Sequence, residues 1–209
     1  MKKNLFITFV CLLAFFSSAP VYGAEGLYVS GNFGFAMASD SDLTNSTVPG
    51  TTINTEFDTG VAIGVALGYD FSKFRVEGEM SYQKNDVSQI GSQGVFFNNT
   101  GKAVAFSFLI NGYYDYINSS AFTPYISAGL GFTQIEFNDI DISGAGFSGS
   151  DDSDTVFAYQ LGIGVGYSVT EKITIDVRYR YIGTEDSEYD ATKAEFASNN
   201  LLFGVRVSF

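Results

Sequence analysis

The chain has 209 residues, of which 45% are hydrophobic and 16% aromatic, and its formal net charge is −12. Nucleic-acid binding depends on lysine and arginine neutralising phosphates, so a chain this acidic is not expected to bind nucleic acid. Histidine is absent and Cys11 is the single cysteine, which excludes histidine-based catalysis and a disulfide framework.

Residues 1–23 have the layout of a secretory signal peptide. Lysines precede an apolar run at residues 5–16, and small and polar residues follow up to Gly23. The run is shorter than the roughly 20 apolar residues of a membrane-spanning helix. We therefore expect residues 1–23 to be removed, Cys11 with them, and residues 24–209 to form one domain; the alternative is a retained N-terminal anchor.

After this segment, bulky apolar residues alternate with small or charged ones, which is the period-two pattern of a β-strand. Between Phe57 and Phe71, the odd positions carry Phe, Val, Ile, Leu, Tyr and one Thr, whereas the even positions carry only Gly, Ala and Asp. The same division recurs from Phe157 to Val169. These runs are longer than soluble strands and suit the roughly 9 to 11 residues with which a tilted strand crosses a bilayer.

In chain order the pattern predicts eight strands, at residues 26–38, 56–71, 74–84, 102–116, 123–137, 155–169, 173–182 and 197–209. The fifth strand changes phase between Phe132 and Ile135, so we expect a bulge or a strand end near Thr133. The connections alternate between long polar segments, at 39–55, 85–101, 138–154 and 183–196, and short ones, at 72–73, 117–122 and 170–172. This asymmetry is typical of antiparallel outer-membrane barrels.

The interior of an eight-stranded barrel is just wide enough to be filled by side chains, so a ring of Phe and Tyr is expected outside, in lipid. Only closed barrels satisfy every backbone amide of strands that span a membrane. The sequence therefore predicts an all-β, eight-stranded, antiparallel up-and-down transmembrane β-barrel. Aromatic residues cluster near strand ends, and we expect some of them to form interfacial girdles: Tyr69, Phe71, Phe74, Tyr82, Tyr113, Tyr114, Tyr116, Tyr125, Tyr167, Tyr179 and Tyr181.

Charged residues share the opposite phase with the glycines, and we expect them inside the barrel. A charge in a narrow lumen is costly unless it is paired. We therefore predict an interior ion-pair network that plugs the lumen, formed by Arg75, Glu77, Glu79, Asp176, Arg178, Arg180 and Arg206. The competing interpretation is a water-filled, selective passage.

Four segments resemble the eight-stranded outer-membrane barrel family that includes OmpA-type transmembrane domains, opacity proteins and bacterial surface antigens: residues 75–82, 109–115, 124–131 and 177–181. Gly204, Val207 and the terminal Phe209 resemble the signal by which the outer-membrane assembly machinery recognises such barrels, with Leu202 where the family pattern prefers a polar residue. The resemblance implies location in the bacterial outer membrane, in contact with its lipid and lipopolysaccharide. It implies no single activity, because the fold hosts adhesins, anchors, pores and lipid enzymes.

The leading functional interpretation is a surface-exposed structural barrel, an adhesin or surface antigen, whose four long segments contact the environment, including a host-cell surface or matrix. The alternatives are a narrow pore for small solutes and a secreted, lipocalin-like carrier with its apolar face inward. Enzymes that resemble this fold use a histidine, so we expect neither enzymatic activity nor a cofactor. Asp151, Asp152 and Asp154 could bind calcium or share divalent ions with lipopolysaccharide, but their spacing is not that of an EF-hand.

Overall fold

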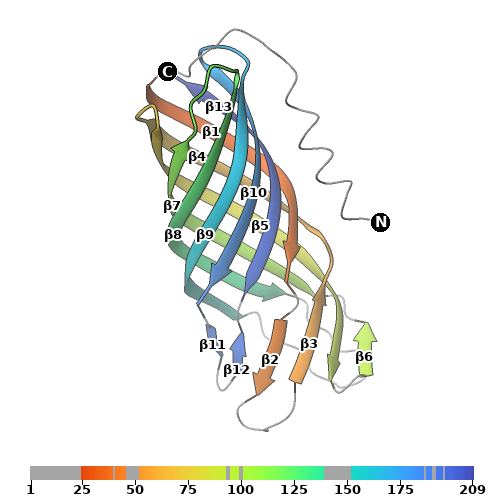
Figure 1. The fold of residues 1–209 in the computed structure, drawn as a ribbon. Helices are drawn as coiled ribbons and strands as arrows, with labels where there is room; N and C mark the ends of the chain where they lie inside the picture. Colours follow the sequence, from red (N-terminus) through yellow and green to blue (C-terminus); the bar gives the residue numbers. More distant parts are fainter. Residues whose placement is uncertain are drawn as a thin grey trace, which may run out of the picture.

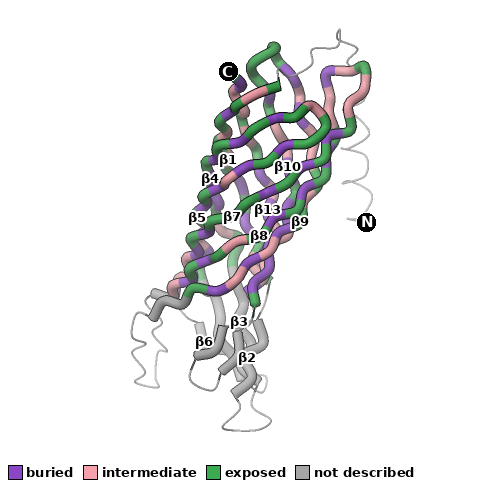
Figure 2. The backbone as a smooth tube through the Cα atoms, turned by 90° about the vertical axis from the view of Figure 1, so that its left-hand side faces the viewer, coloured by how far each residue is buried: buried purple, intermediate pink, exposed green. Residues whose placement is uncertain are grey.

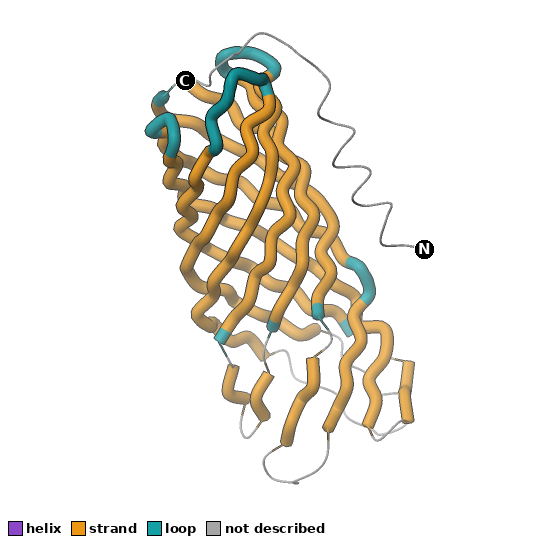
Figure 3. Tube along the Cα trace, in the orientation of Figure 1, coloured by secondary structure: helices purple, strands orange, loops and turns teal. Residues whose placement is uncertain are grey.

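The computed structural model describes residues 25–39, 41–45, 52–92, 95–98, 101–138, 152–185, 187–189, 192–194 and 196–209. Strands account for most of these residues (Figure 3). Within these ranges no helix is long and apolar enough to cross a membrane. The expected signal peptide lies outside the described residues, as does Asp151, and the side chains of Asp152 and Asp154 are not described either, so processing and calcium binding stay predictions.

Eight long strands close into an antiparallel barrel, which confirms the predicted fold (Figure 1). They are β1 (Gly26–Ala38), β4 (Gly60–Asp70), β5 (Phe74–Ser92), β7 (Lys102–Asp115), β8 (Phe122–Asn138), β9 (Asp152–Ser168), β10 (Ile173–Thr184) and β13 (Ala197–Ser208). Their order is β5-β4-β1-β13-β10-β9-β8-β7, and β7 pairs back with β5. Closure leaves none of the eight strands at an open edge of the barrel.

The bulky face of the barrel points outward, as the alternation predicts. Val61, Ile63 and Val65 on β4 are 53%, 55% and 63% exposed, whereas Glu77 and Arg178 are each 5% exposed. Exposed and buried positions alternate along the barrel strands (Figure 2). A lipocalin-like carrier needs the apolar face inside, so that alternative is wrong.

The expected irregularity near Thr133 is absent from β8. Thr133 lies opposite Ser107 of β7 and opposite Val156 of β9, and neither register shifts along the strand. Thr133 and Ile135 are both buried. The apparent change of phase arises because Ile135 is an apolar residue that faces the lumen, not because the strand bulges.

The long connections are not simply polar loops, which corrects the sequence prediction. They contain β2 (Ser41–Asn45), β3 (Thr52–Phe57), β6 (Val95–Asn98), β11 (Ser187–Tyr189) and β12 (Thr192–Ala194), while β5 continues to Ser92. These strands pair in the order β11-β12-β2-β3-β5, and β6 also pairs with β5. The result is a sheet extension at the end of the barrel away from the C-terminus (Figure 1). The predicted strand at 56–71 is accordingly divided, since β3 ends at Phe57 and β4 begins at Gly60.

Candidate functional site

Three tyrosines face the lumen, although the sequence analysis expected aromatic rings outside. Tyr28, Tyr113 and Tyr125 are all buried. Glycines on neighbouring strands make room for two of them. A Cβ on Gly68 would lie 2.3 Å from Cζ of Tyr28, and one on Gly164 would lie 2.4 Å from Cζ of Tyr125. Tyr113 and Tyr125 are therefore not among the aromatic residues that could form an interfacial girdle, because both rings face the lumen.

Arg75 pairs with Asp115, a residue that the sequence analysis did not select. Arg75 Nε lies 2.7 Å from Asp115 Oδ2, and Arg75 Nη2 lies 2.8 Å from Asp115 Oδ1. This is the two-pronged geometry that favours arginine over lysine. The guanidinium also lies over the rings of Tyr113 and Tyr125, at 4.3 and 4.9 Å from their centroids. Asp115 is an even number of positions from Asn111 and Tyr113 on the same strand, so it faces the same side of the sheet. The alternation pattern alone could therefore have predicted that Asp115 faces the lumen.

Glu79 links opposite walls of the barrel. Its carboxylate is fully buried and accepts hydrogen bonds from Arg180 Nη1, from Arg178 Nη2 at 3.1 Å and from Asn111 Nδ2 at 3.2 Å. Glu79 is on β5 and the two arginines are on β10, with β4, β1 and β13 between these strands on one side and β7, β8 and β9 on the other. We call Glu79, Arg178 and Arg180 the Glu79 crossbar, because their ion pairs join strands on opposite sides of the lumen.

Glu77 and Asp176 are held by hydroxyl groups rather than by arginines. Glu77 accepts from Tyr113 at 2.6 Å, from Tyr28 at 3.1 Å and from Ser30 at 3.4 Å. Asp176 accepts from the hydroxyl of Tyr125.

Within the described ranges, Arg206 has no carboxylate at ion-pair distance and lies 5.5 Å from the ring centroid of Tyr28. The seven predicted residues thus share the lumen, but only Glu79, Arg178 and Arg180 form ion pairs with one another.

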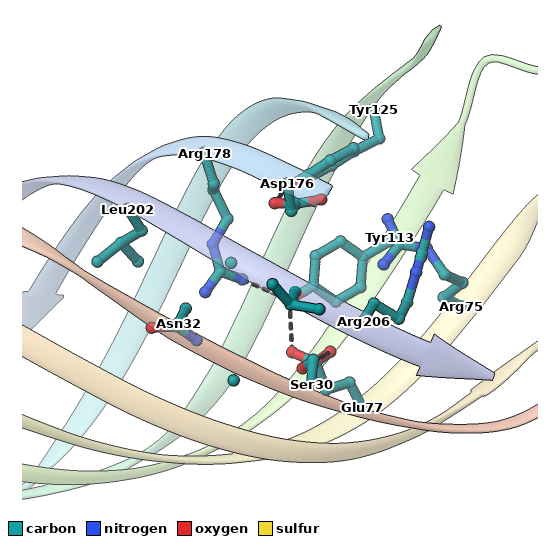
Figure 4. Close-up of a pocket in the computed structure, with 13 residues that line it drawn as sticks. Ser30, Asn32, Arg75, Glu77, Tyr113, Tyr125, Asp176, Arg178, Leu202 and Arg206 are labelled. Atoms are coloured by element: carbon teal, nitrogen blue, oxygen red, sulfur yellow. Dashed lines mark hydrogen bonds between the residues drawn. The ribbon is translucent and has the colours of Figure 1, made fainter. Parts of the chain in front are cut away.

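A small cavity lies beside this network, lined by Glu77, Asp176, Arg178 and Arg206 among others (Figure 4). Its volume is about 30 Å³. Asn32 Oδ1 and Arg206 Nη1, a buried acceptor and a buried donor without protein partners, belong to two of its lining residues. The space suits one or two water molecules and is far below the several hundred Å³ of a typical ligand site.

From the Glu79 crossbar toward the end of the barrel away from the C-terminus, the lumen contains amide side chains and then apolar side chains. Gln83 Nε2 donates to Ser198 Oγ at 2.9 Å. The next layer is apolar and consists of Ala105, Ile135, Val156 and Phe196, each less than 10% exposed. Phe196 is anchored to Thr184, whose backbone N–H donates to the carbonyl of Phe196 at 3.0 Å. The period-two pattern predicted glycines and charged residues inside the barrel, so it did not indicate this apolar layer.

The residues of the predicted assembly signal lie in the C-terminal half of β13 and directly after it. Gly204 faces the lumen, where an added Cβ would lie 3.1 Å from the carbonyl oxygen of Gly31. Phe209 donates its backbone N–H to the carbonyl of Leu27 at 3.0 Å and leaves its side chain 69% exposed. Val207 pairs with Val29 of β1. Recognition by the assembly machinery stays a prediction.

Known proteins are similar to this chain in sequence or in fold. A family model described as outer membrane protein beta-barrel domain matches residues 7–209. Outer membrane protein PagN of Salmonella typhimurium is 32% identical, over 99% of this chain and 100% of that protein. A candidate adhesin of Rickettsia conorii is 31% identical over 42% of this chain and 37% of its own length. The crystal structure of Neisserial surface protein A shares the fold, with a TM-score of 0.57, 22% identity and coverage of 90% of this chain and 99% of that one.

Proposed function

Since the chain belongs to the outer membrane protein beta-barrel domain family, we propose that this integral barrel of the bacterial outer membrane is a surface-exposed attachment protein or antigen. The observation that carries the proposal is the division of the molecule into a filled barrel and a sheet extension at one end (Figure 1). A rigid scaffold with ordered segments at its outer end is a usual platform for binding.

The orientation of the barrel supports this division of roles. The short turns after β4, β7 and β9 lie at the same end of the barrel as the C-terminus (Figure 1). In barrels of this kind, that end faces the periplasm. The extension made by β2, β3, β6, β11, β12 and the outer part of β5 then lies outside the cell. The similarity to the Rickettsia candidate adhesin also favours attachment as its role.

A narrow pore has less support than an attachment role. The Glu79 crossbar joins opposite walls of the lumen, and the apolar layer around Phe196 fills the lumen nearer the outer end. We propose that the crossbar and the apolar layer plug the lumen. Recordings of conductance in planar bilayers test this. The unmodified protein is expected to show no steady conductance; a high basal conductance would favour the pore.

We also propose that the protein has no enzymatic activity. The chain contains no histidine, and the carboxylates of Glu77, Glu79 and Asp176 accept hydrogen bonds from neighbouring side chains. Its partners on this proposal are the lipid and lipopolysaccharide of the outer membrane, the assembly machinery, and a host-cell surface or matrix.

Attachment is tested with bacteria that display either the full chain or a variant in which a short Gly-Ser link replaces residues 187–194, the span of β11 and β12. Binding to cultured epithelial cells and to immobilised matrix proteins is measured for both strains. The variant should lose most of the binding while its unboiled form keeps the gel mobility of a folded barrel. A matched control replaces residues 170–172 in the turn between β9 and β10 and should bind like the unmodified chain. Unchanged binding after removal of β11 and β12, and of each other outer segment in turn, would contradict the proposal.

A further inference from the structure

The hydroxyl group of Tyr113 lies between two side chains of opposite charge. It donates a hydrogen bond to Glu77 Oε1 at 2.6 Å and accepts one from Arg178 Nη1. A phenol has one proton, so donation to the carboxylate leaves the lone pairs of the oxygen for the guanidinium. All three residues are buried and line the cavity of the lumen (Figure 4). Glu77 and Arg178 are therefore joined through this oxygen.

Arg178 has two carboxylates on the facing strand. Glu77 and Glu79 stand two positions apart on β5, so both face the lumen. Arg178 Nη2 lies 3.1 Å from Glu79 Oε2, and Glu79 is the carboxylate at ion-pair distance from Arg178 in the part of the chain that the structure describes. Glu79 also pairs with Arg180, whereas the hydrogen bonds that Glu77 accepts come from hydroxyl groups. The cavity nevertheless leaves about 30 Å³ of free space beside Glu77 and Arg178.

Contacts with the ring hold Tyr113 in this position. The guanidinium of Arg75 lies 4.3 Å from the ring centroid, and Arg75 is itself fixed by its ion pair with Asp115. The ring of Tyr125 packs edge-on, with 5.6 Å between the two centroids. The hydroxyl group is therefore directed at its two partners by side chains that do not belong to the Glu79 crossbar.

Tyr28 offers a comparison, because its hydroxyl group holds the same carboxylate through the other oxygen. It donates to Glu77 Oε2 at 3.1 Å. Among the described residues, the tyrosine that hydrogen-bonds to Arg178 is Tyr113 and not Tyr28. Both tyrosines thus satisfy Glu77, but the contact with the guanidinium distinguishes Tyr113.

We propose that the hydroxyl group of Tyr113 determines which carboxylate Arg178 binds, and that it thereby maintains the Glu79 crossbar. With the hydroxyl in place, Glu77 Oε1 and Arg178 Nη1 are both satisfied, and Nη2 is left for Glu79. Without it, a buried carboxylate and a buried guanidinium lose their shared partner beside free space, and an unpaired buried charge is costly. Arg178 then turns to Glu77, while Glu79 keeps Arg180. The inference concerns the interior of the barrel and does not depend on the proposed attachment.

The test is solid-state NMR of the full chain in lipid bilayers, with isotope labels in the arginine nitrogens and the glutamate carbons. Dipolar couplings between guanidinium nitrogens and side-chain carboxyl carbons identify the partner of Arg178. The variant is Tyr113→Phe, and the matched control is Tyr28→Phe, which removes a hydroxyl group from the same carboxylate. Folding of each variant is checked by the gel mobility of the unboiled protein.

In the unmodified chain, Arg178 should couple to the carboxyl carbon of Glu79 and not to that of Glu77. Tyr113→Phe should transfer most of this coupling to Glu77, and adding Glu77→Gln to that variant should return it to Glu79. Tyr28→Phe should leave the pattern unchanged. A coupling of Arg178 to Glu77 in the unmodified chain, an unchanged pattern in Tyr113→Phe, or the same transfer in Tyr28→Phe would overturn the proposal.

If Tyr113→Phe does not fold, the unmodified chain and Glu77→Gln decide the matter. The hydroxyl group of Tyr113 remains in Glu77→Gln, so Arg178 must keep its coupling to Glu79 there. Loss of that coupling would show that Glu77, and not the hydroxyl group, directs the guanidinium.

Discussion

Replacing Glu79 by glutamine tests whether the crossbar is the main polar support of the lumen. The carboxylate is fully buried and holds the guanidinium groups of Arg178 and Arg180. Glutamine preserves the shape of the side chain but leaves two cations without a counter-charge. Breaking a buried pair from one side costs about 3–5 kcal/mol, so Glu79→Gln should lower the free energy of unfolding by that amount.

The assay is equilibrium urea unfolding in lipid vesicles, followed by the gel mobility of the unboiled protein. Asp86→Asn is the control, because it removes an exposed ion pair and should cost about 1 kcal/mol or less. Adding Arg180→Gln to Glu79→Gln removes one of the stranded cations and should recover part of the loss. A cost below about 1 kcal/mol for Glu79→Gln, or simple addition of the two losses, would refute the argument.

Three further changes test the lipid face, the glycine spacing and the apolar layer. Val65→Arg, in the middle of the outward face of β4, should lower the free energy of unfolding in lipid vesicles by about 2–4 kcal/mol. Gly164→Ala should cost about 1–3 kcal/mol because its Cβ meets the ring of Tyr125, whereas Gly112→Ala, whose nearest contact is 3.9 Å away, should cost less than half as much. Phe196→Ala should cost about 3–5 kcal/mol and yet leave bilayer conductance near zero, because the crossbar remains; a conducting variant would place the seal at Phe196.

The alternation along each strand predicted which residues face the lumen, but it did not predict which side chains they contact. Alternation is a local property of a strand, so the sequence placed Glu79, Arg178 and Arg180 inside correctly. It did not show that Asp115 pairs with Arg75, or that hydroxyl groups rather than arginines hold Glu77 and Asp176. Those contacts join segments 36 to 51 residues apart in the sequence, and which side chains meet depends on the register, tilt and stagger of the strands in the whole barrel.

The eight strands, the outward face and the closed antiparallel architecture could all be predicted from the amino-acid sequence, because each follows from period-two patterning and from the need to pair every backbone amide in lipid. Which side chains meet inside the lumen could be seen only once the strands were assembled in three dimensions. The structure places Tyr28 over Gly68 and Tyr125 over Gly164, and it assembles the apolar layer from β7, β8, β9 and Phe196. It also showed strands within the long connections, since pairing between segments distant in sequence cannot be read from any one of them.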